Sequence, residues 1–300
     1  MNLSLCCISN ILAEQGIKFR TLTYKKFSSY AREEGFNKIT EISLHNLDIT
    51  FKTIKHCVEM GFSGYRMSSN IFPLLTHPDI KIKMYDLPQW EIIKDKFNQI
   101  AIYIKEKKLR ISAHPSEYIT LTSENINSVN NSISDLELHG EIFDRLDLPL
   151  NHVSPLNIHI RKDGDIETLY CSFIKNYEKL SNSVKSRLVL ENNDNVKGTW
   201  SIKKLVSIFH ERNNIPITFD YLHHYFLHDN LSEEEAFHLA FKTWNVTPIF
   251  HYSESRDGTK AHADLPTKIP NIYNKNILLD VELKGKDYAL LKMQNLYSFV

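Results

Sequence analysis

Short apolar runs alternate with longer amphipathic stretches from one end of the chain to the other. Each run holds five or six residues, mostly apolar, which is typical of strands buried on both faces of a sheet. The runs span residues 3–8, 63–67, 109–113, 156–160, 187–191, 216–220, 247–252 and 277–282. Eight such runs, separated by helical patterns, indicate repeated parallel βα units.

The stretches between the runs carry apolar residues at helical spacing. Residues 44–61 end in Gly61, which suits the end of a helix, and residues 90–108 end in lysines that suit the helix dipole. Further helical patterns span residues 132–146, 170–180, 202–212, 232–244 and 287–299. Residues 10–40 predict a long first loop with one short helix of its own, and residues 254–276 predict a second long loop.

The length and the alternation favour an α/β fold with one domain, a closed (β/α)8 TIM barrel over residues 1–300. An open doubly wound sheet is less suitable, because no G-x-G-x-x-G or G-x-x-x-x-G-K motif places a nucleotide at a first turn. In a TIM barrel the active site lies at the C-terminal ends of the strands. These ends are therefore where candidate chemistry is expected.

Composition narrows the possible partners. The 36 basic and 36 acidic residues balance to a net charge of zero, so a nucleic acid would have to be held by a local patch or by metal ions. The four cysteines form no spaced framework, which favours a reducing intracellular compartment. The first residues read as a strand and not a signal peptide, and no apolar run approaches the ~18 residues of a membrane span.

Ionisable or polar side chains close nearly every predicted strand. We expect them to converge, because the strands of a barrel end at one mouth. In chain order they are Asn10, His114, His159, Glu191, Asp220 with His223 and His224 just beyond it, His251 and Glu282.

A single side chain of this kind most simply caps a helix or satisfies a hydrogen bond. Six ionisable groups at successive strand ends are costly to bury together unless cations offset their charge. Imidazoles and carboxylates without sulfur suit Zn²⁺ or Mn²⁺. There are more donors than one ion needs, so a cluster is predicted in which Glu191 bridges two ions. Clustered metals can activate water and stabilise the attacking and leaving oxygens of a phosphoryl displacement.

Eight motifs occur in an order that resembles the UV damage endonuclease family, a branch of the TIM barrels related to three-metal abasic-site endonucleases. They are GYRMSSNIFPLLTHP (64–78), LRISAHPSEYITLTS (109–123), NIHI (157–160), RLVLENND (187–194), FDYLHH (219–224), TWNVTPIFHYSES (243–255), KAHAD (260–264) and ELKGKD (282–287). The resemblance implies a metal-dependent hydrolase that nicks double-stranded DNA on the 5′ side of UV photoproducts and related helix-distorting lesions.

Matching the motifs also implies roles for single residues. His114 and His159 resemble ligands of one ion, and Glu191 would bridge to a second. The second ion's shell would be completed by Asp220, His251 and Glu282, and a third ion would be bound by His223 and His262. Three Mn²⁺ ions are implied, with Zn²⁺ as the alternative. The resemblance implies that Glu191, Asp220 and His77 serve catalysis.

The same matching places other residues against DNA. His77 and Asn10 resemble residues near the scissile phosphate. Glu117 and Tyr118 fall where the family has a polar and aromatic pair that probes the duplex. The resemblance implies damaged duplex DNA as the partner, with no obligate protein partner and a monomeric chain.

Several positions depart from the family pattern. Cys6 and Cys7 replace a glycine and an aromatic residue, Ile249 stands where a lysine near the metals is common, and Glu117 replaces a glutamine. Two alternatives stay open, and only the second follows from these departures. One is a divalent-metal sugar isomerase or epimerase, whose barrels carry similar strand-end ligands. The other is a lesion-binding protein that has lost cleavage.

Overall fold

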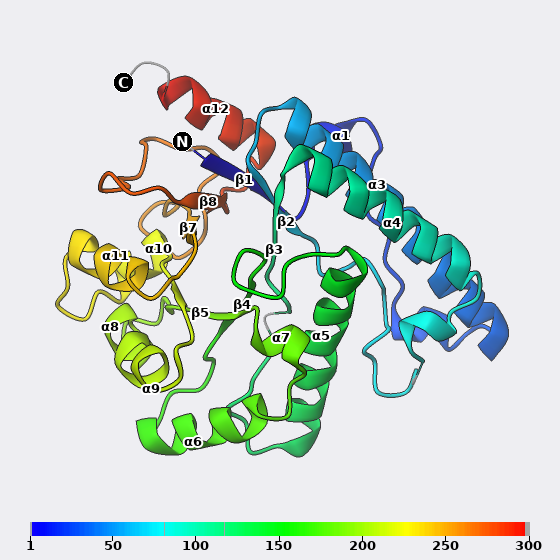
Figure 1. The fold of residues 1–300 in the computed structure, drawn as a ribbon, viewed down its shortest axis with the longest axis horizontal. Coiled ribbons are helices and arrows are strands. Elements are labelled where there is room, and N and C mark those ends of the chain that lie inside the picture. The colour runs from blue at the N-terminus through cyan, green and yellow to red at the C-terminus, as the bar shows by residue number, and fades with distance from the viewer. Residues whose placement is uncertain (1, 81, 117, 298–300) are drawn as a thin grey trace.

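The computed structural model describes residues 2–80, 82–116 and 118–297. Eight parallel strands form one sheet with the order β6-β5-β4-β3-β2-β1-β8-β7 (Figure 1). The strands are β1 (Asn2–Cys6), β2 (Gly64–Met67), β3 (Arg110–Ala113), β4 (Leu156–His159), β5 (Leu188–Glu191), β6 (Ile217–Thr218), β7 (Ile249–Tyr252) and β8 (Leu278–Val281). Seven of them fall within a predicted apolar run, and β1 begins one residue before its run.

The two edge strands of this sheet, β6 and β7, meet just beyond the short β6. Asp220 forms a parallel bridge with His251, and the His251 N–H donates to the Phe219 carbonyl at 2.9 Å. The sheet is therefore a nearly closed barrel, and the (β/α)8 prediction is confirmed. Two predicted metal ligands lie at this closure.

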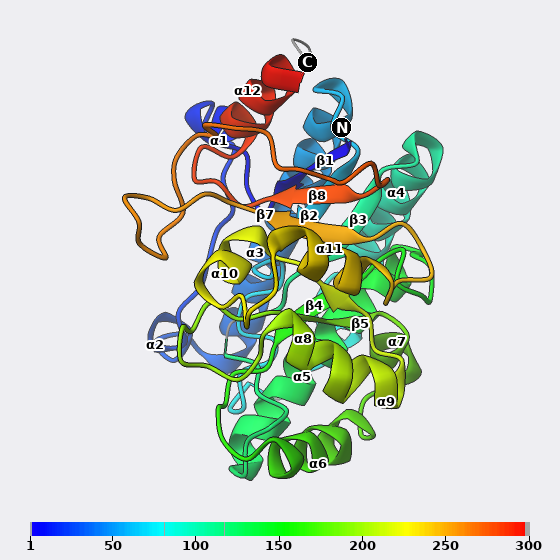
Figure 2. The ribbon, with the colours of Figure 1, turned by 90° about the vertical axis from the view of Figure 1, so that its left-hand side faces the viewer.

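Helices cover the outside of the barrel (Figures 1 and 2). The longer ones are α3 (Arg32–Glu59), α4 (Trp90–Lys107), α5 (Ile126–Arg145), α6 (Ile166–Tyr177), α11 (Glu233–Phe241) and α12 (Asp287–Tyr297). Shorter segments are α1 (Asn10–Glu14), α2 (Tyr24–Phe27), η1 (Met84–Asp86), α7 (Asn182–Lys185), α8 (Ile202–Leu205), η2 (Val206–His210), α9 (Glu211–Asn213) and α10 (Tyr221–Phe226). The longer helices turn buried apolar faces toward the barrel.

The prediction of a loop over residues 10–40 is wrong in its second part. Two short helices, α1 and α2, occupy this connection, and α3 already begins at Arg32. Glu33 and Glu34 lie in its first turn, where acidic side chains suit the helix dipole. Gly35 allows α3 to pack closely on Phe27, because a Cβ there would lie 2.6 Å from the phenyl ring.

The second predicted loop, residues 254–276, has no helix and no β-strand beyond an isolated bridge (Ser255–His262). Glu254 orders it, since its carboxylate accepts hydrogen bonds from the Thr267 N–H and hydroxyl and from the Tyr252 hydroxyl. Among the described helices, none combines the length and the apolar character that crossing a membrane requires.

Candidate metal centre

Seven predicted ligands meet at the C-terminal ends of the strands, and together they are called the metal centre below. Its members are His114, His159, Glu191, Asp220, His223, His251 and Glu282. The barrel register brings distant positions into line, since His159 pairs with Glu191 and Asp220 bridges to His251. The fold, and not sequence proximity, therefore assembles this centre.

Glu191 lies in the middle of the metal centre and is almost fully buried. Four imidazoles surround its carboxylate. The ring-nitrogen to carboxylate-oxygen distances are 3.3 Å for His114, 3.7 Å for His159, 3.2 Å for His223 and 3.0 Å for His251. Burial raises the pKa of Glu191, but the charge of neighbouring imidazoles, that of His251 first, outweighs it and holds this pKa well below its usual range.

The ligand atoms fall into three overlapping groups, each with its atoms within 4.8 Å of one another. The groups are His114, His159 and Glu191; Glu191, Asp220 and His223; and Asp220, His251 and Glu282. Glu191 and Asp220 each belong to two groups, which suits carboxylates that bridge neighbouring ions.

The predicted pairing of His223 with His262 differs from this arrangement. His223 groups with Glu191 and Asp220, whereas His262 belongs to none of the three groups found among the described residues. The His262 Nδ1 lies 2.9 Å from the Glu282 backbone oxygen and 3.9 Å from its carboxylate. His262 is thus beside the metal centre, behind Glu282.

The hydrogen bonds of two histidines fix how their rings face the metal centre. The Nδ1 of His114 lies 3.1 Å from the Pro115 carbonyl, and that of His159 lies 3.1 Å from the Asn193 side-chain oxygen. A carbonyl oxygen only accepts, so each Nδ1 carries the proton and each Nε2 turns its lone pair toward Glu191. Burial and the neighbouring imidazoles lower the pKa of His159 to about 3 despite Glu191, which keeps this ring neutral.

These contacts form a site that fits divalent cations. A lone pair facing a carboxylate is repulsive unless a cation lies between them. In addition, Asp220 Oδ2 is buried and lacks a hydrogen-bond partner among the described residues. Such atoms are costly unless they bind a ligand. The donor set of imidazoles and carboxylates suits Zn²⁺ or Mn²⁺.

The segment FDYLHH shows how local structure orients two of the ligands. Asp220 caps α10, and its carboxylate accepts the His223 N–H at 2.7 Å. The capping geometry turns His223 back toward Asp220 and Glu191. His224 points elsewhere and packs beside Phe219, with ring centroids 5.4 Å apart. Of the two histidines that follow Asp220, only His223 therefore faces the metal centre.

Three buried residues of the centre were missed by the sequence analysis. Asp280 lies 3.7 Å from His251 Nε2, Asn157 donates a hydrogen bond to Glu191, and Arg66 forms an ion pair with Glu282. Alternation on the strands was the available signal, because Asp280 is two residues before Glu282 and Asn157 two before His159. These partners orient the ligands from behind.

The predicted DNA-contacting residues lie outside the three ligand groups. Tyr118 is 82% exposed, and the Asn10 side chain donates to the Lys284 carbonyl at 3.1 Å. His77 stacks on Tyr24, with ring centroids 4.1 Å apart. Glu117 lies outside the described residues. We call Asn10, His77 and Tyr118 the rim.

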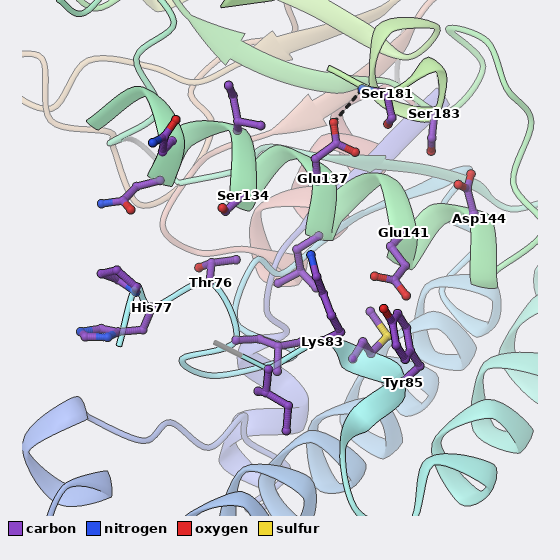
Figure 3. Close-up of a pocket in the computed structure, with 18 of the residues that line it drawn as sticks. Thr76, His77, Lys83, Tyr85, Ser134, Glu137, Glu141, Asp144, Ser181 and Ser183 are labelled. Atoms are coloured by element: carbon purple, nitrogen blue, oxygen red, sulfur yellow. Dashed lines mark hydrogen bonds between the residues drawn. The ribbon is translucent and has the colours of Figure 1, made fainter. Parts of the chain in front are cut away.

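A separate cavity of about 990 Å³ lies between the β2–α4 connection and α5 (Figure 3). His77 stands at one end of it, and acidic residues of α5, among them Glu137 and Glu141, line its other side. Glu137 accepts a hydrogen bond from the Ser181 N–H at 2.7 Å. None of the metal-centre residues lines this cavity, so it is no part of the centre.

The sequence profile of the UV-endonuclease UvdE family matches residues 1–300. The chain belongs to this family. Among its relatives, a UV DNA damage endonuclease of Bacillus cereus (strain B4264) is 31% identical over 293 residues, which cover 91% of this chain and 87% of that protein. One from Bacillus mycoides (strain KBAB4) is 29% identical over 290 residues, with the same coverage. The predicted resemblance is confirmed.

Solved structures agree with this assignment to the UvdE family. The crystal structure of SacUVDE has a TM-score of 0.84 and 27% identity, and the match covers 100% of this chain and 98% of that chain. A D-tagatose 3-epimerase-like protein has a TM-score of 0.57 with 11% identity, covering 100% of this chain and 96% of that one. At that identity the likeness shows the fold alone. Sugar epimerases, the alternative considered above, thus share the barrel fold with this chain.

Proposed function

We propose that this UvdE-family chain is a metal-dependent endodeoxyribonuclease that hydrolyses a phosphodiester bond on the 5′ side of UV photoproducts and related helix-distorting lesions. The observation that supports it best is the buried Glu191 carboxylate, which four imidazoles surround and toward which His114 and His159 turn the lone pairs of their Nε2 atoms. Bound divalent ions would supply an activated water and would stabilise charge on the attacking and leaving oxygens.

The residues of the metal centre would hold three ions, with Mn²⁺ preferred and Zn²⁺ as the alternative. His114 and His159 would bind one ion with Glu191, and Asp220, His251 and Glu282 would bind another. His223 and His262, with the shared carboxylates, would serve the third. Asn157 and Arg66 hold Glu191 and Glu282 in place while DNA enters and leaves.

The rim would hold the DNA. His77 accepts the Asp79 N–H at its Nδ1, at 3.3 Å, so a neutral ring carries its proton on Nε2 and can donate to a phosphate. Asn10 would contact the same region of the backbone. Tyr118, with Glu117 beside it in the sequence, would probe the duplex and stack where a lesion is extruded, because poorly stacked bases cost less to extrude.

This function implies damaged double-stranded DNA as the partner, a monomer with no obligate protein partner, and an intracellular location.

The test is a nicking assay on UV-irradiated duplex with the metal-free protein and with added Mn²⁺ or Zn²⁺, together with elemental analysis. We expect incision on the 5′ side of photoproducts only when metal is present. Irradiated DNA that stays intact under every metal would refute cleavage, and lesion-selective binding in that case would support the alternative of a binding protein.

A further inference from the structure

The connection between α1 and α3 has a charge unlike that of the rest of the chain. Residues 15–32 contain five basic residues and no acidic residue, whereas the whole chain has 36 of each sign. All five are exposed: Lys18, Arg20, Lys25, Lys26 and Arg32. These five residues are called the basic shelf.

The backbone of the basic shelf is fixed by α3. The buried Asn46 accepts the Arg20 N–H at 2.8 Å and donates to the Arg20 carbonyl at 2.9 Å. The same amide donates to the Asn70 carbonyl at 2.9 Å, which ties the shelf to the connection after β2. His45 contacts the Lys18 carbonyl at 2.9 Å. The charges therefore sit on an ordered surface, and ordering them on DNA would cost little backbone entropy.

The shelf adjoins the rim at the mouth of the barrel. It belongs to the connection that follows β1, so it lies at the same end of the strands as the metal centre, as does α10 (Figure 2). Tyr24, next to Lys25, stacks on His77 with an interplanar angle of 11°. Arg32 donates to the Ile80 carbonyl at 3.1 Å. A duplex held at His77 would thus meet the shelf next.

Most of the shelf's charge is not neutralised by the protein. Within the part of the chain that the structure describes, Lys18 and Lys25 form no ion pair, and the Lys26 ammonium lies over the Tyr30 ring at 4.9 Å from its centroid. Arg20 is 3.7 Å from Glu41, and both side chains are more than half exposed, so this pair is weak. An exposed cationic surface of this kind attracts a polyanion.

We propose that the basic shelf binds the phosphate backbone of duplex DNA beside the metal centre, independently of base sequence and of damage. This inference rests on the proposed function, since it extends the DNA path from His77 onto α2. Contacts to phosphates position a duplex without reading its sequence. The shelf would therefore supply affinity, and the rim would supply the distinction between damaged and intact DNA.

The test compares two double variants of the whole chain. Lys25→Gln with Lys26→Gln removes two charges from the shelf, and Lys107→Gln with Lys108→Gln removes two exposed charges at the end of α4, which leads into the opposite end of the barrel. Binding to undamaged and to UV-irradiated duplex is measured by fluorescence anisotropy between about 50 and 200 mM salt. The melting temperature of each variant is measured to check that both are folded.

Each lost phosphate contact should reduce the slope of log K against log salt by about 0.9, so the shelf variant should lose nearly two units of slope. Its affinity should fall by the same factor on damaged and undamaged DNA, and the α4 variant should match the wild type. An unchanged slope in the shelf variant, or an equal loss in both variants, would overturn the proposal. A wild-type chain that binds duplex but nicks no irradiated DNA would refute the proposed function alone, and one that binds no duplex would refute both.

Discussion

The metal centre and the rim of this barrel are built in different ways. The residues of the centre stand at strand ends or within one turn of them, are largely buried, and are oriented by hydrogen bonds from neighbours such as Asn157 and Asn193. The rim stands on the connections after the strands, where Tyr118 is almost fully exposed and His77 is held by an aromatic stack. Strand register leaves little freedom to the centre, whereas connections can change without disturbing the barrel.

This difference predicts a large, nearly all-or-none loss of incision when a residue of the metal centre is replaced. Glu191→Gln keeps the size of the side chain but removes the charge that two ligand groups share. We expect incision of irradiated duplex to fall by at least about 10²–10³-fold, as when a fixed electrostatic partner of a transition state is removed. Single-turnover nicking and metal content per chain measure the effect.

Glu137→Gln is the matched control, since its carboxylate accepts a backbone hydrogen bond in the cavity beside α5, away from the centre. Its nicking rate should equal that of the wild type. Near-normal incision by Glu191→Gln would show that the centre is not where the chemistry occurs, and the contrast between centre and rim would fail.

A smaller effect, a loss of metal affinity, is expected from replacing a residue that only orients a metal ligand. Asp280 is buried and faces His251 Nε2 at 3.7 Å, while the other ring nitrogen faces Glu191 and Glu282. Asp280→Asn should reduce metal affinity by about 10–100-fold, the usual cost of losing a carboxylate behind a ligating histidine. Titration of the metal-free protein with Mn²⁺ measures this change.

Ser112 offers the control for Asp280, because its hydroxyl, on β3, donates to the same carboxylate at 3.0 Å. Ser112→Ala should change metal affinity much less than Asp280→Asn. Excess Mn²⁺ should restore nicking by Asp280→Asn, and a loss that excess metal does not restore would assign Asp280 to the packing of the barrel instead.

The barrel and the donors of the centre could be predicted because they leave a periodic signal. Buried parallel strands read as apolar runs, and a donor directly after each run is visible in the sequence. Asp280 and Arg66 were missed because they lie inside runs, where a single polar residue reads as an interruption. Only the structure shows that Asp280 faces His251 and that Arg66 faces Glu282.

The connections were harder to predict. The start of α3 at Arg32 depends on Gly35 packing against Phe27, a contact within a segment that carries many polar residues. His223 groups with Glu191 and Asp220 and not with His262. This grouping depends on the Asp220 cap of α10. Tyr225, an aromatic residue of α10, is 67% exposed. Such outcomes depend on tertiary contacts that no local pattern carries.

At the rim we expect partial losses of function and not an all-or-none loss. Tyr118→Ala removes an exposed aromatic ring that would stack on a base, and base stacking is worth about 1–3 kcal/mol. The preference for irradiated over undamaged duplex should fall roughly tenfold, with metal content unchanged. Competition binding measures this preference. Tyr225→Ala is the control, another exposed tyrosine at the mouth, and an equal loss there would remove the special role of Tyr118.

The smallest expected effect concerns the stack that holds His77. Tyr24→Leu removes the ring that lies 4.1 Å from the imidazole, whereas Tyr24→Phe keeps a ring there. Aromatic pairs are worth about 0.5–1.5 kcal/mol, so Tyr24→Leu should reduce kcat/KM by roughly 2–10-fold and Tyr24→Phe should restore it.

If Tyr24 acts by orienting His77, the two positions must be coupled. In a His77→Ala background the further change Tyr24→Leu should cost nothing, because the imidazole it orients is gone. An additive loss in the double variant would mean that Tyr24 contacts DNA itself or stabilises α2. In the first case its loss would also lower the affinity for undamaged duplex, and in the second it would lower the melting temperature, so the three explanations separate.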